Sequence, residues 1–246
     1  MRPTVLTHFA RLVVAAAIAL PTLGLLSATA EAAGTGAPTT GSLLTAAKSA
    51  IGKQTSVHLV LTSRSSSTSV EERLEADLGK ASGSEAISEG NETAVIKLTP
   101  TYAYLSGNSS GLTKLFGMTA AEAKKVGRDW VSVKAGTTQY KDLAASITVS
   151  SVAGILPAAK GTKLYKPASP AKKLYTLKWD NAATSSAPAL VNTLTLSAVG
   201  ATLPVQETTT ASGGGKETVA LSKWDERVLV SAPPAGSTIP LAKVSG

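Results

Sequence analysis

Hydrophobic and polar residues alternate along much of the chain from residue 56 onward, which is the period-two pattern of β-strands. In the first such stretch, Val57, Leu59 and Leu61 fall on one side of the predicted strand. Turns rich in Ser, Gly, Asn and Pro separate one stretch from the next. The predicted strands cover residues 56–63, 73–81, 83–90, 92–99, 101–107, 129–135, 162–168, 173–179, 190–199, 203–211, 216–224 and 227–234.

A helix is predicted before the first strand, because apolar residues between 43 and 51 share one face at helical spacing. Thr40 stands where the N-cap of this helix could lie. The pattern turns helical again between residues 108 and 157, with short helices around 112–116 and 119–126. Apolar residues at mixed spacing then follow over 143–156.

Strands and helices do not alternate with the regularity of a parallel sheet, so the predicted class is α+β. We expect one large antiparallel sheet with a few helices on one face, and a hairpin turn at residues 212–216. Segments such as 94–98 and 102–105 place apolar groups on both faces, so both faces need cover. The second face either packs into an ordinary two-layer core or curves into a partly enclosed cavity.

The first 33 residues have the pattern of a secretory signal peptide: a basic start, an apolar stretch over 12–26 and then small residues. A transmembrane anchor is the alternative, but Pro21 and Gly24 interrupt the apolar stretch, which is shorter than the roughly 20 residues of a span. We therefore predict a signal peptide over 1–33, a Gly/Pro/Thr linker over 34–40 and a single domain over 41–246.

The chain contains no cysteine, which excludes disulfides, thiolate metal sites, cysteine nucleophiles and lipid attachment through a thioether. Its only histidines are His8 and His58, so an all-histidine metal site is excluded as well. We therefore expect no cofactor and no metal. The exported chain is predicted to be secreted or associated with the cell envelope, without a lipid anchor.

The formal net charge of +8 favours transient contact with an anionic membrane surface. The lysines are scattered, however, and a solvated surface is the simpler interpretation. Without a stripe of basic and aromatic residues, the chain is not expected to bind nucleic acid.

Residues 107–111 match the G-x-S-x-G motif of serine hydrolases and lie between a predicted strand and a predicted helix. That mechanism needs a histidine later in the chain, and none follows Ser109. Residues 169–172 spell S-x-x-K without the motifs that accompany it in β-lactamases. The chain is therefore predicted not to be an enzyme.

Other polar features have simple structural interpretations. The densest acidic group lies in an alternating strand pattern, which indicates a solvated sheet face and not a metal site; it comprises Glu71, Glu72, Glu75 and Asp77. Asn91 and Asn108 begin glycosylation sequons. His58, which has apolar neighbours, is interpreted as a packed or edge residue, and the three tryptophans as packing anchors.

The segment Val219–Leu241, VALSKWDERVLVSAPPAGSTIPL, resembles the terminal strand pair of the mycobacterial LppX/LprG-type lipoproteins, and SVHLVLT over 56–62 resembles their opening. The similarity of layout covers most of residues 40–241. That family is similar in fold to the LolA/LolB carriers. The resemblance implies a strongly curved, unclosed half-barrel whose concave face, covered by helices, holds acyl chains. The family's lipobox cysteine is missing, so membrane tethering does not carry over.

The favoured hypothesis is an exported carrier or binding protein for lipid or glycolipid acyl chains in the cell envelope. The alternative is an envelope sensor or interaction module that uses the same fold to bind another protein. For the first, strand parity and helix faces predict a ligand-binding wall made of Leu59, Leu61, Ile96, Leu98, Leu112, Leu115, Phe116, Val152, Ile155 and Leu156.

Overall fold

The computed structural model describes residues 37–65, 70–165, 173–184 and 187–245. The predicted signal peptide, most of the predicted linker and the S-x-x-K tetrapeptide lie outside these residues. The described part contains one mixed sheet in the order β12-β6-β5-β4-β3-β2-β1-β11-β10-β9-β8-β7. The strands are β1 (Ser56–Arg64), β2 (Glu71–Gly79), β3 (Gly83–Glu89), β4 (Glu92–Leu98), β5 (Tyr102–Gly107), β6 (Trp130–Lys134), β7 (Lys163–Tyr165), β8 (Leu174–Asn181), β9 (Leu190–Ser197), β10 (Pro204–Ala211), β11 (Lys216–Ser222) and β12 (Thr238–Pro240).

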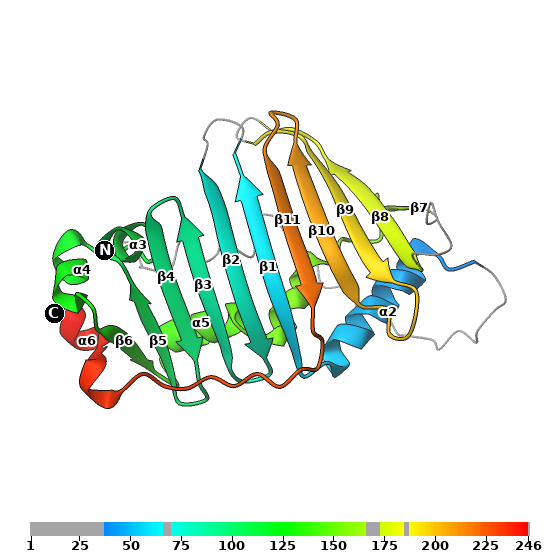
Figure 1. The fold of residues 1–246 in the computed structure, drawn as a ribbon. Coiled ribbons are helices and arrows are strands. Elements are labelled where there is room, and N and C mark those ends of the chain that lie inside the picture. Colours follow the sequence, from blue (N-terminus) through cyan, green and yellow to red (C-terminus); the bar gives the residue numbers. More distant parts are fainter. Residues whose placement is uncertain (1–36, 66–69, 166–172, 185–186, 246) are drawn as a thin grey trace.

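The sheet is antiparallel throughout except at one end, where β12 pairs with β6 in parallel. Its two edges, β7 and β12, do not pair with each other, so the sheet stays open. Figure 1 shows it as a long twisted layer in which β1 and β11 join the two groups of strands. The predicted α+β class and the unclosed antiparallel sheet are confirmed, and the predicted hairpin turn joins β10 to β11.

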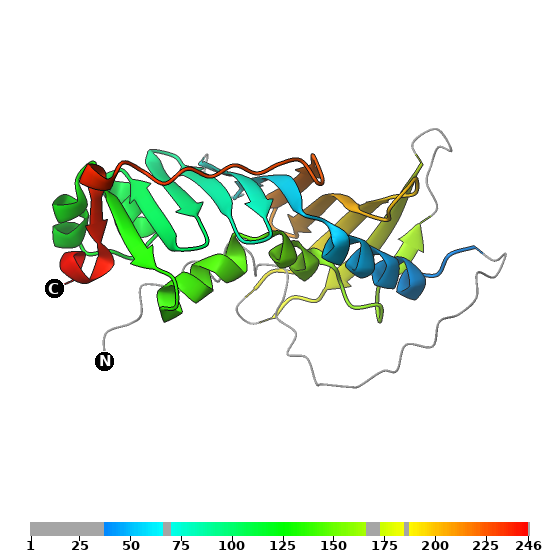
Figure 2. The same cartoon turned by 90° about the horizontal axis from the view of Figure 1, so that it is seen from below.

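Helices cover one face and one end of this sheet. Figure 2 shows α2 and α5 lying along the same face. The N-cap of α2 is Thr39, one residue before the predicted position, because the Thr39 hydroxyl accepts from the Ser42 amide while Ser42 caps Thr39 in return. The helices are α2 (Thr40–Lys53), α3 (Ser109–Lys114), α4 (Ala120–Val126), α5 (Thr138–Ser146), α6 (Leu241–Val244) and the 3₁₀ segments η1 (Val149–Ile155) and η3 (Ala235–Ser237).

Strand register fixes which side chains meet the helices. Leu59 lies opposite Ala76 of β2 and Leu221 of β11, and Leu61 lies opposite Leu74. We call this side of the sheet the inner face, and its opposite the outer face. Side chains alternate between the two faces along a strand, so one cross-strand pair determines which face every side chain of that strand occupies. The inner face carries the larger of two hydrophobic clusters, which extends from β6 to β11.

The C-terminal prediction is wrong in one respect. Residues 227–234 do not form a strand, and β11 ends at Ser222, two residues before Trp224. Lys223 and Asp225 adopt positive φ angles of 51° and 63°, which turn the chain out of the sheet. The segment then runs across the lower ends of the central strands to β12 (Figure 1).

Candidate functional site

A cavity of about 60 Å³ lies at the middle of the inner face, between the sheet and the α5–η1 segment. We call it the seam cavity, because it lies where β1 meets β11. Its apolar floor comes from β1, β2 and β11, and its cover comes from α5 and η1. The residues that line it are Leu59, Leu61, Leu74, Ala76, Leu78, Glu85, Ser146, Ser151, Val152, Ile155, Glu207, Glu217 and Val219.

The cover of the seam cavity is an irregular element. η1 is a 3₁₀ helix of seven residues, longer than the three or four residues usual for this geometry, and no side chain caps its N-terminus. Ile155 at its end packs against the larger cluster and also against a smaller cluster formed by α2, β8 and β9. The cover therefore bridges two separately packed parts of the molecule.

Carboxyl groups border the otherwise apolar cavity. Glu85 and Glu207 are buried, with 6% and 4% of their surface exposed. Burial raises the pKa of each to about 7, helped by the charge of Glu72 for Glu85 and of Glu217 for Glu207. Burial also raises the pKa of Glu217 itself. Near neutral pH these carboxyl groups therefore change between a protonated form, which donates a hydrogen bond, and an anionic form, which only accepts.

The predicted ligand-binding residues fall into two sets. Leu59, Leu61, Val152 and Ile155 line the seam cavity together. The others lie elsewhere: Leu115 and Leu156 are partly buried against the larger cluster, and four are fully packed within it, namely Ile96, Leu98, Leu112 and Phe116.

Several lining residues were not among the predicted ligand-binding residues, although the alternation of side chains along β2 and β3 could have identified them. Leu74, Ala76 and Leu78 share one side of β2, and the register places that side opposite Leu59 and Leu61. Glu85 falls on the same side as Ile87, which marks it as an inward carboxyl in an apolar row. The contribution of Ser146 and Ser151 had no comparable signal, because it depends on how α5 and η1 cross the sheet.

A second and larger hollow, of about 860 Å³, lies beside β5 and β6, against the C-terminal segment. Tyr102 and Tyr104 contribute to its wall, with their ring centroids 5.9 Å apart. Pro233, Pro240 and Leu241 close its other side. An exposed groove of this kind is what the interaction-module alternative requires, and that alternative stays a prediction.

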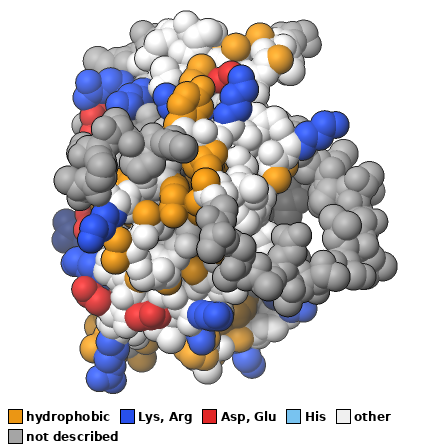
Figure 3. Space-filling view, turned by 90° about the vertical axis from the view of Figure 1, so that its right-hand side faces the viewer, with side chains coloured by type: hydrophobic (Ala, Val, Ile, Leu, Met, Phe, Trp, Pro, Cys, Tyr) orange, Lys and Arg blue, Asp and Glu red, His pale blue; other side chains and the backbone are white. Residues whose placement is uncertain are grey.

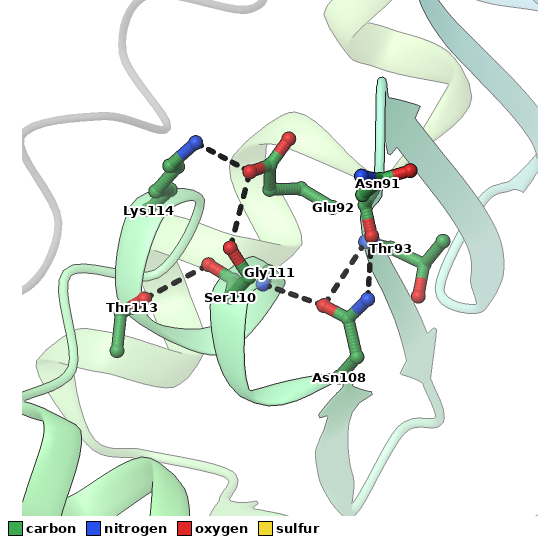
Figure 4. Close-up of polar contacts among 8 residues, drawn as sticks. All are labelled: Asn91, Glu92, Thr93, Asn108, Ser110, Gly111, Thr113 and Lys114. Atoms are coloured by element: carbon green, nitrogen blue, oxygen red, sulfur yellow. Dashed lines mark hydrogen bonds and ion pairs between the residues drawn. The ribbon is translucent and has the colours of Figure 1, made fainter.

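The G-x-S-x-G match is a helix start. Figure 4 shows the Asn108 side chain at the first turn of α3, where its Oδ1 accepts from the Gly111 amide at 2.7 Å. Its Nδ2 donates to the Asn91 carbonyl at 2.6 Å, so the amide nitrogen of this sequon is already bonded. Ser109 is exposed, and three strands separate β5, which precedes it, from β1, which carries His58. No nucleophile and base are brought together here.

Ser110 and the neighbouring Lys114 belong to a small polar cluster on α3. Both bond to the carboxylate of Glu92 on β4, Ser110 by its hydroxyl at 3.0 Å and Lys114 as an ion pair (Figure 4). This cluster fixes α3 against the sheet and neutralises an inward carboxylate.

The predicted acidic group is divided between the two faces. Asp77 lies on the outer face with Glu75, and its carboxylate bonds to His58 Nδ1 at 2.8 Å. Glu72 has the opposite parity and points inward, where burial and the charges of Glu89 and Glu217 raise its pKa. Within the described residues, no group of three or more His, Cys, Asp or Glu side chains is arranged to hold a metal ion.

Two of the three tryptophans pack against the hydrophobic clusters, as predicted, and Trp130 does not. Trp224 contacts the larger cluster and Trp179 the smaller one, while Lys97 Nζ lies 4.9 Å from the ring centroid of Trp130.

Among the described helices, none combines the length and apolar content needed to cross a membrane.

Comparison with known proteins gives structural similarity only. No family model matches the chain, and no curated protein matches it. Lipoprotein LppX of Mycobacterium tuberculosis is similar in structure, with 15% identity and a TM-score of 0.45 over 78% of this chain and 99% of LppX. LprF of Mycobacterium bovis is similar with 15% identity and a TM-score of 0.47, over 79% of this chain and 96% of LprF. At 15% identity no residue role transfers from either protein to this chain.

Proposed function

We propose that this chain binds the apolar chain of a lipid-like amphiphile in the seam cavity, as an exported carrier or binding protein of the cell envelope. The observation that carries the proposal is a hollow at the centre of the inner face, floored by the leucines of β1 and β2. Apolar residues around an unfilled space are the usual surroundings of an apolar ligand.

The size of the cavity defines what binding requires. A space of about 60 Å³ corresponds to a few water molecules at about 10–15 Å³ each, so it admits only the first part of an acyl chain. Binding therefore includes an outward movement of η1 from the sheet. Its irregular geometry and its uncapped start favour η1 over α2 or α5 as the element that moves.

A neutral apolar dye tests this proposal. N-phenyl-1-naphthylamine is expected to become fluorescent on binding, and dodecanol to displace it. Ile155→Trp places an indole into the cavity and should weaken dye binding at least tenfold, because the added side chain occupies the ligand's space.

Val191→Trp provides the matched control, since Val191 is 52% exposed on β9 and a tryptophan there leaves the cavity unchanged. Circular dichroism and thermal unfolding confirm that both variants fold. Dye binding that is absent from the parent protein, or that is equal in both variants, contradicts the proposal.

A further inference from the structure

We propose that the seam cavity selects amphiphiles with an ammonium head group and rejects those with a carboxylate, an inference that rests on the proposed function. The geometry behind it is a row of inward carboxyl groups around an apolar floor, one of which has a buried oxygen without a hydrogen-bond partner.

The charged side chains at inward positions of the described strands are all acidic. Inward register positions on β2, β3, β10 and β11 hold carboxyl groups; they are Glu72, Glu85, Glu89, Glu207 and Glu217. No lysine or arginine holds an inward register position on the described strands. Glu92 is neutralised by Lys114 from α3, but that pair lies away from the cavity lining.

Glu207 is the focus of this arrangement. Its side chain lines the cavity, is almost fully buried, and leaves Oε1 without a hydrogen-bond partner. On β9 the residue opposite is Leu194, on β11 the neighbouring inward carboxyl is Glu217, and the covering η1 segment has no titratable side chain. A buried carboxyl without a partner is costly, and a donor carried by a ligand would remove that cost.

Glu85 provides a second position on the opposite side of the floor. Three strands separate β3 from β10, so the two strands lie roughly 19 Å apart along the sheet at about 4.8 Å per strand. Leu59, Leu61 and Val219 occupy the space between them. An amphiphile can therefore place its chain over these residues and its head group at either carboxyl.

Charge decides which head group fits. An ammonium meets carboxylates as ion pairs in a poorly solvated site, and its N–H groups supply the missing donors. A carboxylate head group meets like charges there wherever these carboxyl groups are ionised, and no lysine or arginine at an inward strand position offsets them, which disfavours binding. An alcohol can donate one hydrogen bond without charge, and it should fall between the two.

The test compares three ligands with the same chain: dodecylamine, dodecanol and dodecanoate, each below its micelle concentration at pH 7.5, by displacement of the neutral dye. We expect dodecylamine to bind at least tenfold more tightly than dodecanoate. The double variant Glu85→Gln, Glu207→Gln should reduce that ratio at least fivefold, because it removes both charges from the cavity lining. The control Glu71→Gln, Glu75→Gln makes the same charge change on the outer side of β2 and should leave the ratio unchanged.

The outcomes separate the two proposals. Equal binding of dodecylamine and dodecanoate, or a ratio that the inner-face double variant does not change, overturns the head-group inference. In that case dodecanol binding that Ile155→Trp weakens still supports the proposed function. If neither the dye nor any of the three ligands binds, the proposed function fails and the head-group inference fails with it.

Discussion

Helices cover strands β2 to β6 more completely than strands β7 to β10. Strands β2 to β6 lie under α3, α4 and α5, and their cluster contains fully buried large side chains such as Leu98 and Phe116. Strands β7 to β10 rely mainly on α2, and their cluster is small, with Leu177, Leu194 and Leu196 as its sheet side. Figure 3, viewed from the β7 end, shows apolar side chains reaching the surface among lysines and arginines.

The difference explains where the cavity lies. The well-covered part is filled, as protein interiors normally are, and leaves little room for a ligand. α2 contributes to both clusters, through Ile51 to the larger one and through Leu43 to the smaller one. Between the two clusters the seam cavity is covered by η1 and the end of α5. A binding site is expected where two packed units meet beneath an irregular segment such as η1.

The largest expected effect of a single substitution comes from the filled part. Leu98→Ala removes a side chain with no exposed surface and should lower the free energy of unfolding by about 2–5 kcal/mol. Leu59→Ala, at the cavity floor, should cost less than about 2 kcal/mol, because its side chain already borders empty space. Urea denaturation of both variants checks this, and equal losses would contradict the contrast between the two sites.

The buried carboxyl groups predict a pH effect of similar size. The pKa of Glu85 and of Glu207 is about 7 in the folded chain against an ordinary value of 4.5. Between these values the unfolded chain releases the proton while the folded chain retains it, so stability falls as pH rises. The loss is on the order of 3 kcal/mol per group and is complete above pH 7.

This pH effect is measurable by denaturation between pH 4 and pH 8. Glu85→Gln, Glu207→Gln mimics the neutral groups and should flatten the profile relative to the parent, whereas the outer-side double variant should not. A parent profile that is no steeper than that of the inner-face variant would show that these groups are not buried as described.

A smaller effect is expected where α3 docks on β4. A Cβ on Gly111 would lie against the Thr93 carbonyl well inside van der Waals contact, so Gly111→Ala should cost about 1–3 kcal/mol. Gly154→Ala in η1 meets nothing within 4 Å and serves as the matched control, with no expected loss. Thermal unfolding distinguishes them, and a neutral Gly111→Ala would mean that α3 does not dock this closely.

The smallest effect is expected at the cover of the thin part. Thr39→Ala removes the side-chain half of the α2 capping box and should cost about 1 kcal/mol. Thr45→Ala on the exposed side of the same helix should cost nothing. Because α2 is the main cover of β8 and β9, hydrogen exchange should rise there in Thr39→Ala and stay unchanged on β4.

Most of the fold could be predicted from periodicity, because Val57, Leu59 and Leu61 have the parity that the register later assigns to the inner face. The turn after β11 could not, since LSKWDERV alternates as a strand does while Lys223 and Asp225 take positive φ angles. Some of the residues that line the seam cavity could be predicted as well. Parity identified Leu59 and Leu61, but whether an inward residue faces a cavity or a filled core depends on distant segments, and so Leu98 looked equivalent to Leu59.

Ligand binding in the seam cavity is tested most directly by an isotope-filtered NOE experiment on methyl-labelled protein with bound dodecylamine. We expect contacts from the ligand methylenes to the methyl groups of Leu59, Leu61 and Val152, and none to those of Leu98. Contacts confined to the hollow beside Tyr102 and Leu241, or no contacts to the inner face at saturating ligand, would contradict it.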